Sequence, residues 1–148
     1  MKKQFKIPKL EGHSLSENYP LYGNPATDNK KRNVITKDFT YVDFKKIADL
    51  APFTLKEWAN FLHTSERTLQ RYAKDNSSFN GLQIERILLF KILIKEGNHL
   101  FGKENFGIWL HRKLFSLSFK TPMEMLITHE GVQEVIDILG RIEHGIVA

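Results

Sequence analysis

The spacing of apolar residues changes sharply near residue 40 of this 148-residue chain. Residues 1–37 are rich in polar residues, proline and glycine, and they show no helical or strand period. That composition predicts an extended basic arm. Beyond it, apolar residues recur every three to four positions, as they do in helices that bury one face. Strand-like alternation never lasts beyond a few residues. The predicted fold is therefore all-α with an extended N-terminal arm.

Helix starts are marked by caps and helix interiors by apolar periods. The predicted helices begin at Thr40, Thr54 and Ser65 and then span residues 82–96, 105–111, 121–128 and 131–144. Thr54 with Glu57, and Thr121 with Glu124, have the capping-box spacing, in which side chain and backbone exchange hydrogen bonds. The segment 82–96 is apolar around most of its circumference, which predicts the central buried helix. Gly97 is its expected C-terminal cap.

Residues 54–74 predict two short helices joined by a tight corner, as in a helix-turn-helix. The second helix carries DNA-compatible side chains on its first turns and outer face, namely Ser65, Glu66, Arg67, Thr68, Gln70, Arg71 and Lys74. Arginine and glutamine read guanine and adenine edges, while hydroxyl groups and lysine bind phosphates. His63 stands at the corner, where glycine is common, so a left-handed backbone there would be strained. The alternative is a plain helical hairpin whose outer face is only solvated.

Positive charge is concentrated at the front of the chain. The formal net charge is +5, with seven basic against three acidic residues in positions 1–33. Positions 34–98 have ten against eight, and positions 99–148 have five against six. This asymmetry favours two different partners for the basic and the neutral parts. The alternative is a common solubility effect with no bearing on partners. Strong DNA binding would need a dimer, or help from the arm, to gather enough phosphate contacts.

Composition and motifs exclude several other classes. Cysteine is absent, so disulfides and thiolate metal sites are excluded. No apolar stretch approaches the ~20 residues that span a bilayer, and the N-terminus lacks the apolar region of a secretion signal. The six histidines include no HExxH motif and no pair spaced i, i+4. We therefore predict a cytoplasmic protein with no catalytic or metal site, no cofactor and no membrane partner.

The C-terminal helix ends in an unusual group of residues. Gly140 costs ~1 kcal/mol relative to alanine inside a helix, which a neighbour packed close to the backbone would explain. Polar functions then gather beside the chain end, followed by a short apolar tail; these residues are Arg141, Glu143, His144, Gly145, Ile146, Val147 and Ala148. Such a tail is free to enter a cavity. The alternative is an ordinary amphipathic helix that packs on its own core and frays at its end.

These motifs resemble a known family. The stretch 65–72 (SERTLQRY) is similar to the Xre-type DNA-binding half of the Xre/MbcA/ParS antitoxins. The stretches 106–110 (FGIWL), 121–126 (TPMEML) and 139–145 (LGRIEHG), together with Gly131, resemble the toxin-binding domain of that family. The resemblance covers about residues 38–148. It departs from the family at residues 116–120, where a turn with glycine or asparagine usually precedes the proline.

The resemblance implies partners and a mechanism. The protein partner would be a RES-domain toxin that consumes NAD, and the last helix and tail of the antitoxin would cover the toxin's NAD pocket. Toxin contact would then fall on residues 141–148 and DNA contact on the second helix of the helix-turn-helix. Residues 38–98 would form the Xre-like domain that binds operator DNA, and residues 99–148 the toxin-binding domain. A homodimer within a hetero-oligomeric complex is expected, because one module contacts only half an operator.

Two other functions remain open at this point. The first is a stand-alone helix-turn-helix transcriptional regulator with no toxin partner. The second is an adaptor whose helix-turn-helix has lost DNA binding and serves only for dimerisation.

Overall fold

The computed structural model describes residues 39–146 of the chain. Polar side chains at the helix N-termini set where its helices begin. Thr54, Asn80 and Thr121 each close a capping box with the residue three positions on. The elements are α2 (Tyr41–Ala48), α3 (Leu55–Phe61), α4 (Glu66–Asp75), α5 (Gly81–Phe101), α6 (Lys103–Leu110), the 3₁₀ turn η1 (Phe115–Leu117), α7 (Pro122–Met125) and α8 (His129–Glu143). The all-α prediction is confirmed for this part of the chain. The predicted arm, residues 1–37, lies outside the described residues.

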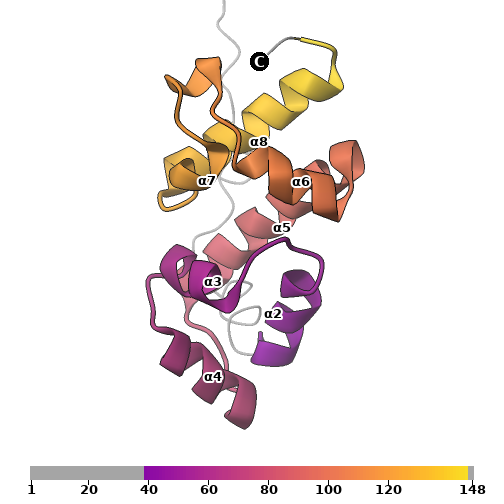
Figure 1. The fold of residues 1–148 in the computed structure, drawn as a ribbon. Helices are drawn as coiled ribbons and strands as arrows, with labels where there is room; N and C mark the ends of the chain where they lie inside the picture. The colour runs from indigo at the N-terminus through magenta and orange to yellow at the C-terminus, as the bar shows by residue number, and fades with distance from the viewer. Residues whose placement is uncertain (1–38, 147–148) are drawn as a thin grey trace, which may run out of the picture.

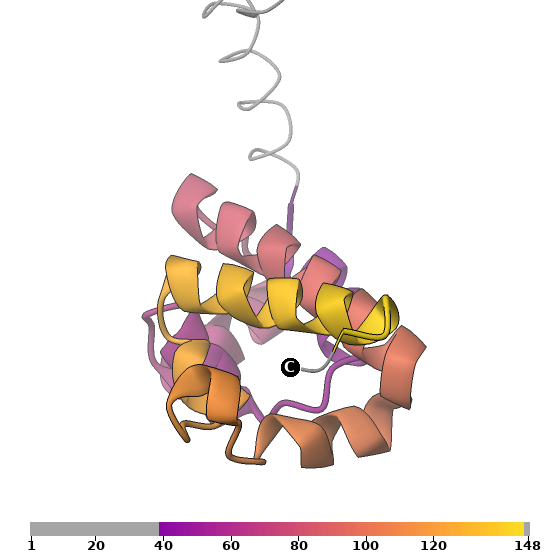
Figure 2. The same cartoon turned by 90° about the horizontal axis from the view of Figure 1, so that it is seen from above.

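Helix α5 is the central element of the fold, as predicted. Helices α2, α3 and α4 lie on one side of α5, and α6, α7 and α8 lie on the other side (Figure 1). Helix α8 packs along α5, which Figure 2 shows from above. The buried side chains of α5 recur every three to four positions and share one broad face, namely Ile84, Ile87, Phe90, Leu93 and Ile94, so the helix is buried around only part of its circumference. One continuous core therefore joins the two groups of helices.

An aromatic cluster fixes the first group of helices on α5. The ring of Phe61 stacks on that of Phe90 with centroids 4.8 Å apart, and Trp58 lies 5.3 Å from Phe90. Phe44 on α2 meets Trp58 edge to face at 5.1 Å. Aromatic pairs in these geometries contribute about 0.5–1.5 kcal/mol each beyond their burial. The helix-turn-helix segment is thus rigidly attached to the central helix.

The prediction that the central helix ends at Gly97 is wrong. Helix α5 continues to Phe101 and ends at Gly102, which has φ +76°. Gly97 is buried in the helix, where a Cβ atom would lie only 2.3 Å from the ring of Phe106. Its physical role is close approach rather than termination, because the missing side chain leaves room for the Phe106 ring of α6 against the backbone of α5.

Replacement of Gly97 by alanine is expected to destabilise the protein by about 1–3 kcal/mol, the usual cost of overpacking a core. The matched control is Gly140→Ala, since no atom lies within 4 Å of a Cβ atom built there. Helix propensity alone should make that variant more stable by up to ~1 kcal/mol. Urea unfolding of both variants measures the two effects. A Gly97→Ala protein as stable as the parent would contradict the packing described here.

Arg86 ties the two groups of helices together. Its guanidinium donates hydrogen bonds to the carbonyl oxygens of Phe61 at the end of α3, Leu126 at 2.7 Å and Ile127 at 2.5 Å. Burial lowers the pKa of this guanidinium from its ordinary value, against the attraction of Glu130. The predicted boundary between residues 98 and 99 falls within α5, so the two predicted domains share a helix as well as this contact.

Among residues 39–146, no helix combines the length and the apolar character that crossing a membrane requires.

Candidate DNA-binding and protein-binding surfaces

Helices α3 and α4 meet at a tight corner. His63 has φ +53°, the left-handed conformation expected at this position, and its N–H donates to the carbonyl of Asn60 at 3.2 Å. The N–H of Thr64 donates to the carbonyl of Ala59 at 2.9 Å. Ala59 is buried, as the close approach of the two helices requires. Two short helices joined by a tight corner are thus present, as predicted for residues 54–74.

The outer face of α4 presents basic side chains to solvent. Arg67, Arg71 and Lys74 are exposed, and their spacing along the helix places them on one face. The exposed residues Glu66 and Gln70 flank this row. The opposite side of the helix carries the fully buried Leu69. The structure therefore brings the predicted DNA-binding side chains of α4 together on one solvent-facing surface.

Ser65 and Thr68 have an internal role at the start of α4. The Ser65 hydroxyl accepts a hydrogen bond from the Thr68 N–H at 3.0 Å, and the two hydroxyl oxygens lie 2.9 Å apart. Ser65 is exposed, whereas Thr68 is half-buried. These side chains cap the helix, so part of their hydrogen-bonding capacity is already used.

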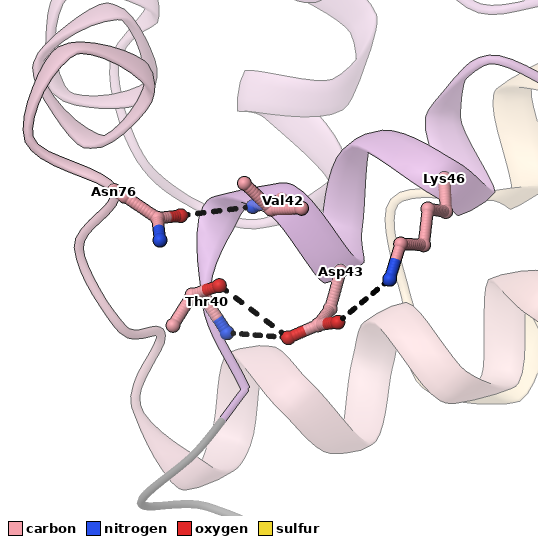
Figure 3. Close-up of polar contacts among 5 residues, drawn as sticks. All are labelled: Thr40, Val42, Asp43, Lys46 and Asn76. Carbon is pink, nitrogen blue, oxygen red and sulfur yellow. Dashed lines mark hydrogen bonds and ion pairs between the residues drawn. The ribbon is translucent and has the colours of Figure 1, made fainter.

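A clamp that the sequence analysis missed holds the other end of α4 (Figure 3). Asn76 ends the helix with φ +45°, and its Oδ1 accepts a hydrogen bond from the N–H of Val42 at 3.1 Å. Beside it, Asp43 accepts from the N–H of Thr40, which lowers the pKa of the carboxyl group, and Lys46 lies 3.4 Å from the same carboxylate. Asparagine is one of the few residues that adopt the left-handed conformation readily. The asparagine at position 76 was therefore the feature of the sequence that could have predicted where α4 ends.

Two backbone hydrogen bonds close the C-terminal turn of α8. The Gly145 N–H donates to the Ile142 carbonyl at 3.0 Å, and the Ile146 N–H donates to the Arg141 carbonyl at 2.8 Å. With Gly145 at φ +74°, this is a Schellman motif. The helix end is thus a defined turn rather than a frayed one. Val147 and Ala148, which complete the predicted tail, lie outside the described residues.

The predicted toxin-facing residues point away from the core. Arg141, Glu143, His144, Gly145 and Ile146 are all exposed. The apolar stripe of the same helix packs inward, with Val132, Val135, Ile138 and Leu139 buried. Glu143 lies 3.7 Å from His99 of α5, a contact between largely exposed groups that contributes little to stability. The apolar side of α8 therefore anchors the helix in the core, and its last turn is exposed to solvent.

The close neighbour expected at Gly140 is not found among residues 39–146. A Cβ atom built on this glycine meets no other atom within 4 Å. Folding of these residues therefore gives no reason for glycine at this helical position.

A loop between α6 and α7 also departs from expectation. We call residues 112–120 the aromatic loop; it contains η1 and an isolated antiparallel bridge between Leu114 and Lys120. Ser118 and Phe119 have φ +54° and +64°. Glycine and asparagine favour this conformation, whereas here a serine and a phenylalanine adopt it. Sequence reasoning identified the unusual composition of the loop but not its exposed aromatic rings.

Within the part of the chain that the structure describes, no three histidine, aspartate or glutamate side chains come together as metal ligands would.

Comparison with known proteins connects these surfaces to a family. Residues 96–145 match the family model described as the antitoxin Xre/MbcA/ParS C-terminal toxin-binding domain. The chain is 28% identical over 144 residues to antitoxin Xre of Photorhabdus laumondii, which covers 92% of this chain and 95% of that protein. It is 32% identical over 82 residues to antitoxin Xre of Yersinia enterocolitica, or 54% of this chain and 55% of that protein. Residues 96–145 therefore match the toxin-binding domain of the Xre/MbcA/ParS antitoxins, and the chain is similar over most of its length to a protein named antitoxin Xre.

Proposed function

We propose that this antitoxin neutralises a RES-domain toxin that consumes NAD, and that it does so by covering the toxin's active site with the end of α8 and the tail. We further propose that it represses its own operon by binding operator DNA through α4. It acts by stoichiometric binding rather than by catalysis, and in the cytoplasm, where NAD and the operator are both present.

One observation carries the neutralising part of the proposal. The last turn of α8 has exposed polar side chains on Arg141, Glu143 and His144, while the preceding turns of the same helix are anchored in the core. A rigid helix with a solvent-facing end is suited to entering a cavity without losing much conformational freedom. Such a plug need not imitate NAD. It needs bulk at the mouth of the pocket and a larger interface around it that holds it in place.

Support for the DNA-binding part comes from the fixed position of α4. The helix is capped at Ser65 and clamped at Asn76, so the row formed by Arg67, Arg71 and Lys74 has a defined direction. Helix-turn-helix proteins place such a row in the major groove. One copy makes few phosphate contacts, so we propose that two copies bind an operator within a hetero-oligomeric complex with the toxin.

The neutralising function is tested with the protein encoded next to this chain. That protein alone is expected to deplete NAD in a purified assay, whether by hydrolysis, phosphorolysis or ADP-ribosyl transfer. Addition of the full-length antitoxin should stop NAD loss at a fixed molar ratio, with a sharp break in the titration because the inhibitor is consumed stoichiometrically. NAD loss that continues at saturating antitoxin would reject the proposal.

A further inference from the structure

The aromatic loop exposes two phenylalanine rings side by side. Phe115 is 80% exposed and Phe119 is 63% exposed. Their ring centroids are 5.6 Å apart in an edge-to-face arrangement. Two adjoining aromatic rings form an apolar surface of a kind that soluble proteins usually bury or use for binding.

These rings are held in place by their own loop. Leu117, between them in sequence, is buried and fixes the loop to the core. The Leu114 N–H donates to the Lys120 carbonyl at 3.0 Å, and the Phe119 N–H donates to the Leu114 carbonyl at 2.9 Å. The rings therefore project from a hydrogen-bonded turn, and little further ordering is needed for them to bind a partner.

The backbone of this turn is strained where the second ring is attached. Ser118 and Phe119 follow one another with φ +54° and +64°, a region that a bulky side chain such as phenylalanine rarely adopts. Strain of this type persists where the surrounding structure enforces it, and it is a pointer to function. Folding gains little from the exposed ring of Phe119, so the strained position is better explained by a contact made outside this chain.

The position of the loop relates it to the toxin-binding surface. The loop lies within the matched toxin-binding domain. Figure 1 shows the segment between α6 and α7 and the end of α8 at the end of the molecule away from α4, and Figure 2 shows them on different sides of that end. A partner that covers this whole end of the molecule would therefore contact both.

The charges around the rings indicate the chemistry of the partner. Arg112, Lys113 and Lys120 belong to the loop and are exposed. The surface of a partner that would complement the loop is an apolar hollow flanked by carboxylates. Complementary charges favour association and set its register. A second copy of this chain fits less well, because a two-fold contact would bring the same basic groups face to face.

We propose that the aromatic loop is a second anchor for the toxin, in which Phe115 and Phe119 insert into an apolar hollow with an acidic rim. This inference rests on the proposed function, because the toxin that the end of α8 covers is the same partner. The anchor supplies affinity, while the end of α8 blocks the active site.

The test compares toxin binding with stability. A full-length variant with Phe115→Ser and Phe119→Gly removes both rings, and glycine also relieves the strain at position 119. We expect toxin affinity to fall by about 10- to 100-fold, as for a loss of interface hot spots, while the melting temperature stays equal or rises. The matched control is Leu50→Ala, which removes another exposed apolar side chain outside the matched domain.

Titration calorimetry measures the affinity for the toxin, and light scattering measures the oligomeric state of the free antitoxin. Affinity within twofold of the parent protein would overturn the anchor, as would an equal loss in the Leu50→Ala control. A variant that binds toxin normally but changes its own oligomeric state would show a contact between copies and would also overturn it. Normal binding by this variant, combined with loss of inhibition when residues 141–148 are removed, would reject the anchor and leave the proposed function standing.

Discussion

An antitoxin that lacks residues 141–148 is expected to fold normally and to leave its toxin active. Of residues 141–146, all are exposed apart from the half-buried Ile142, which packs at the edge of the core. The buried stripe of α8 extends only to Leu139, so every fully buried residue of the core is kept. The loss is confined to the turn that we propose as the plug. Cells that express the toxin with this variant should lose NAD and stop growing, as with the toxin alone.

Two measurements separate this outcome from simple unfolding. The helical signal and melting temperature of the truncated protein should remain close to those of the full chain. Operator binding should remain as well, since α4 lies at the opposite end of the molecule (Figure 1). Full protection by a truncated antitoxin that is folded would contradict the assignment of residues 141–148 to the toxin's active site.

Replacement of both Arg67 and Arg71 by alanine is expected to weaken operator binding by a few kcal/mol. Each good arginine contact to a base contributes about 1–3 kcal/mol of discrimination, and both side chains lie on the exposed face of α4. Neither side chain is part of the core, so stability should change little. Fluorescence anisotropy with a labelled promoter fragment, repeated over a range of salt concentrations, measures the loss.

A matched variant distinguishes base contacts from general attraction to DNA. Replacement of Lys91 and Lys95 removes the same two positive charges from exposed positions on α5. This control should reduce affinity much less, because it leaves the face of α4 intact. Equal losses in both variants would indicate non-specific electrostatics. If the native protein, alone or with toxin, shows no salt-dependent promoter binding, the helix-turn-helix serves only as an adaptor.

Several helix starts could be predicted because they depend on neighbouring residues. Capping boxes such as those at Thr54 and Thr121 involve residues three positions apart, and the sequence displays them directly. The end of α5 could not be predicted in this way. A glycine near the end of an apolar run is typical of a helix cap, yet Gly97 is there because Phe106 packs against it. The distinction requires knowledge of the packing of α6, which local sequence does not give.

The candidate surfaces likewise combine features that the local sequence predicts with features that depend on residues far apart in the chain. The face of α4 was predictable because the helical period alone places Arg67, Arg71 and Lys74 together. The tie made by Arg86 and the clamp made by Asn76 join residues far apart in sequence, so no local pattern announces them. The exposure of Phe115 and Phe119 was also hidden, because aromatic residues are usually assigned to a core.

Access of NAD to the toxin while the antitoxin is bound tests the central claim most directly. A non-hydrolysable NAD analogue should bind the free toxin and should bind the complex with an antitoxin that lacks residues 141–148. Titration calorimetry should detect no binding of the analogue to the complex with the full-length antitoxin. If the analogue binds that full-length complex as tightly as it binds the free toxin, the active site is open, and the end of α8 does not cover it.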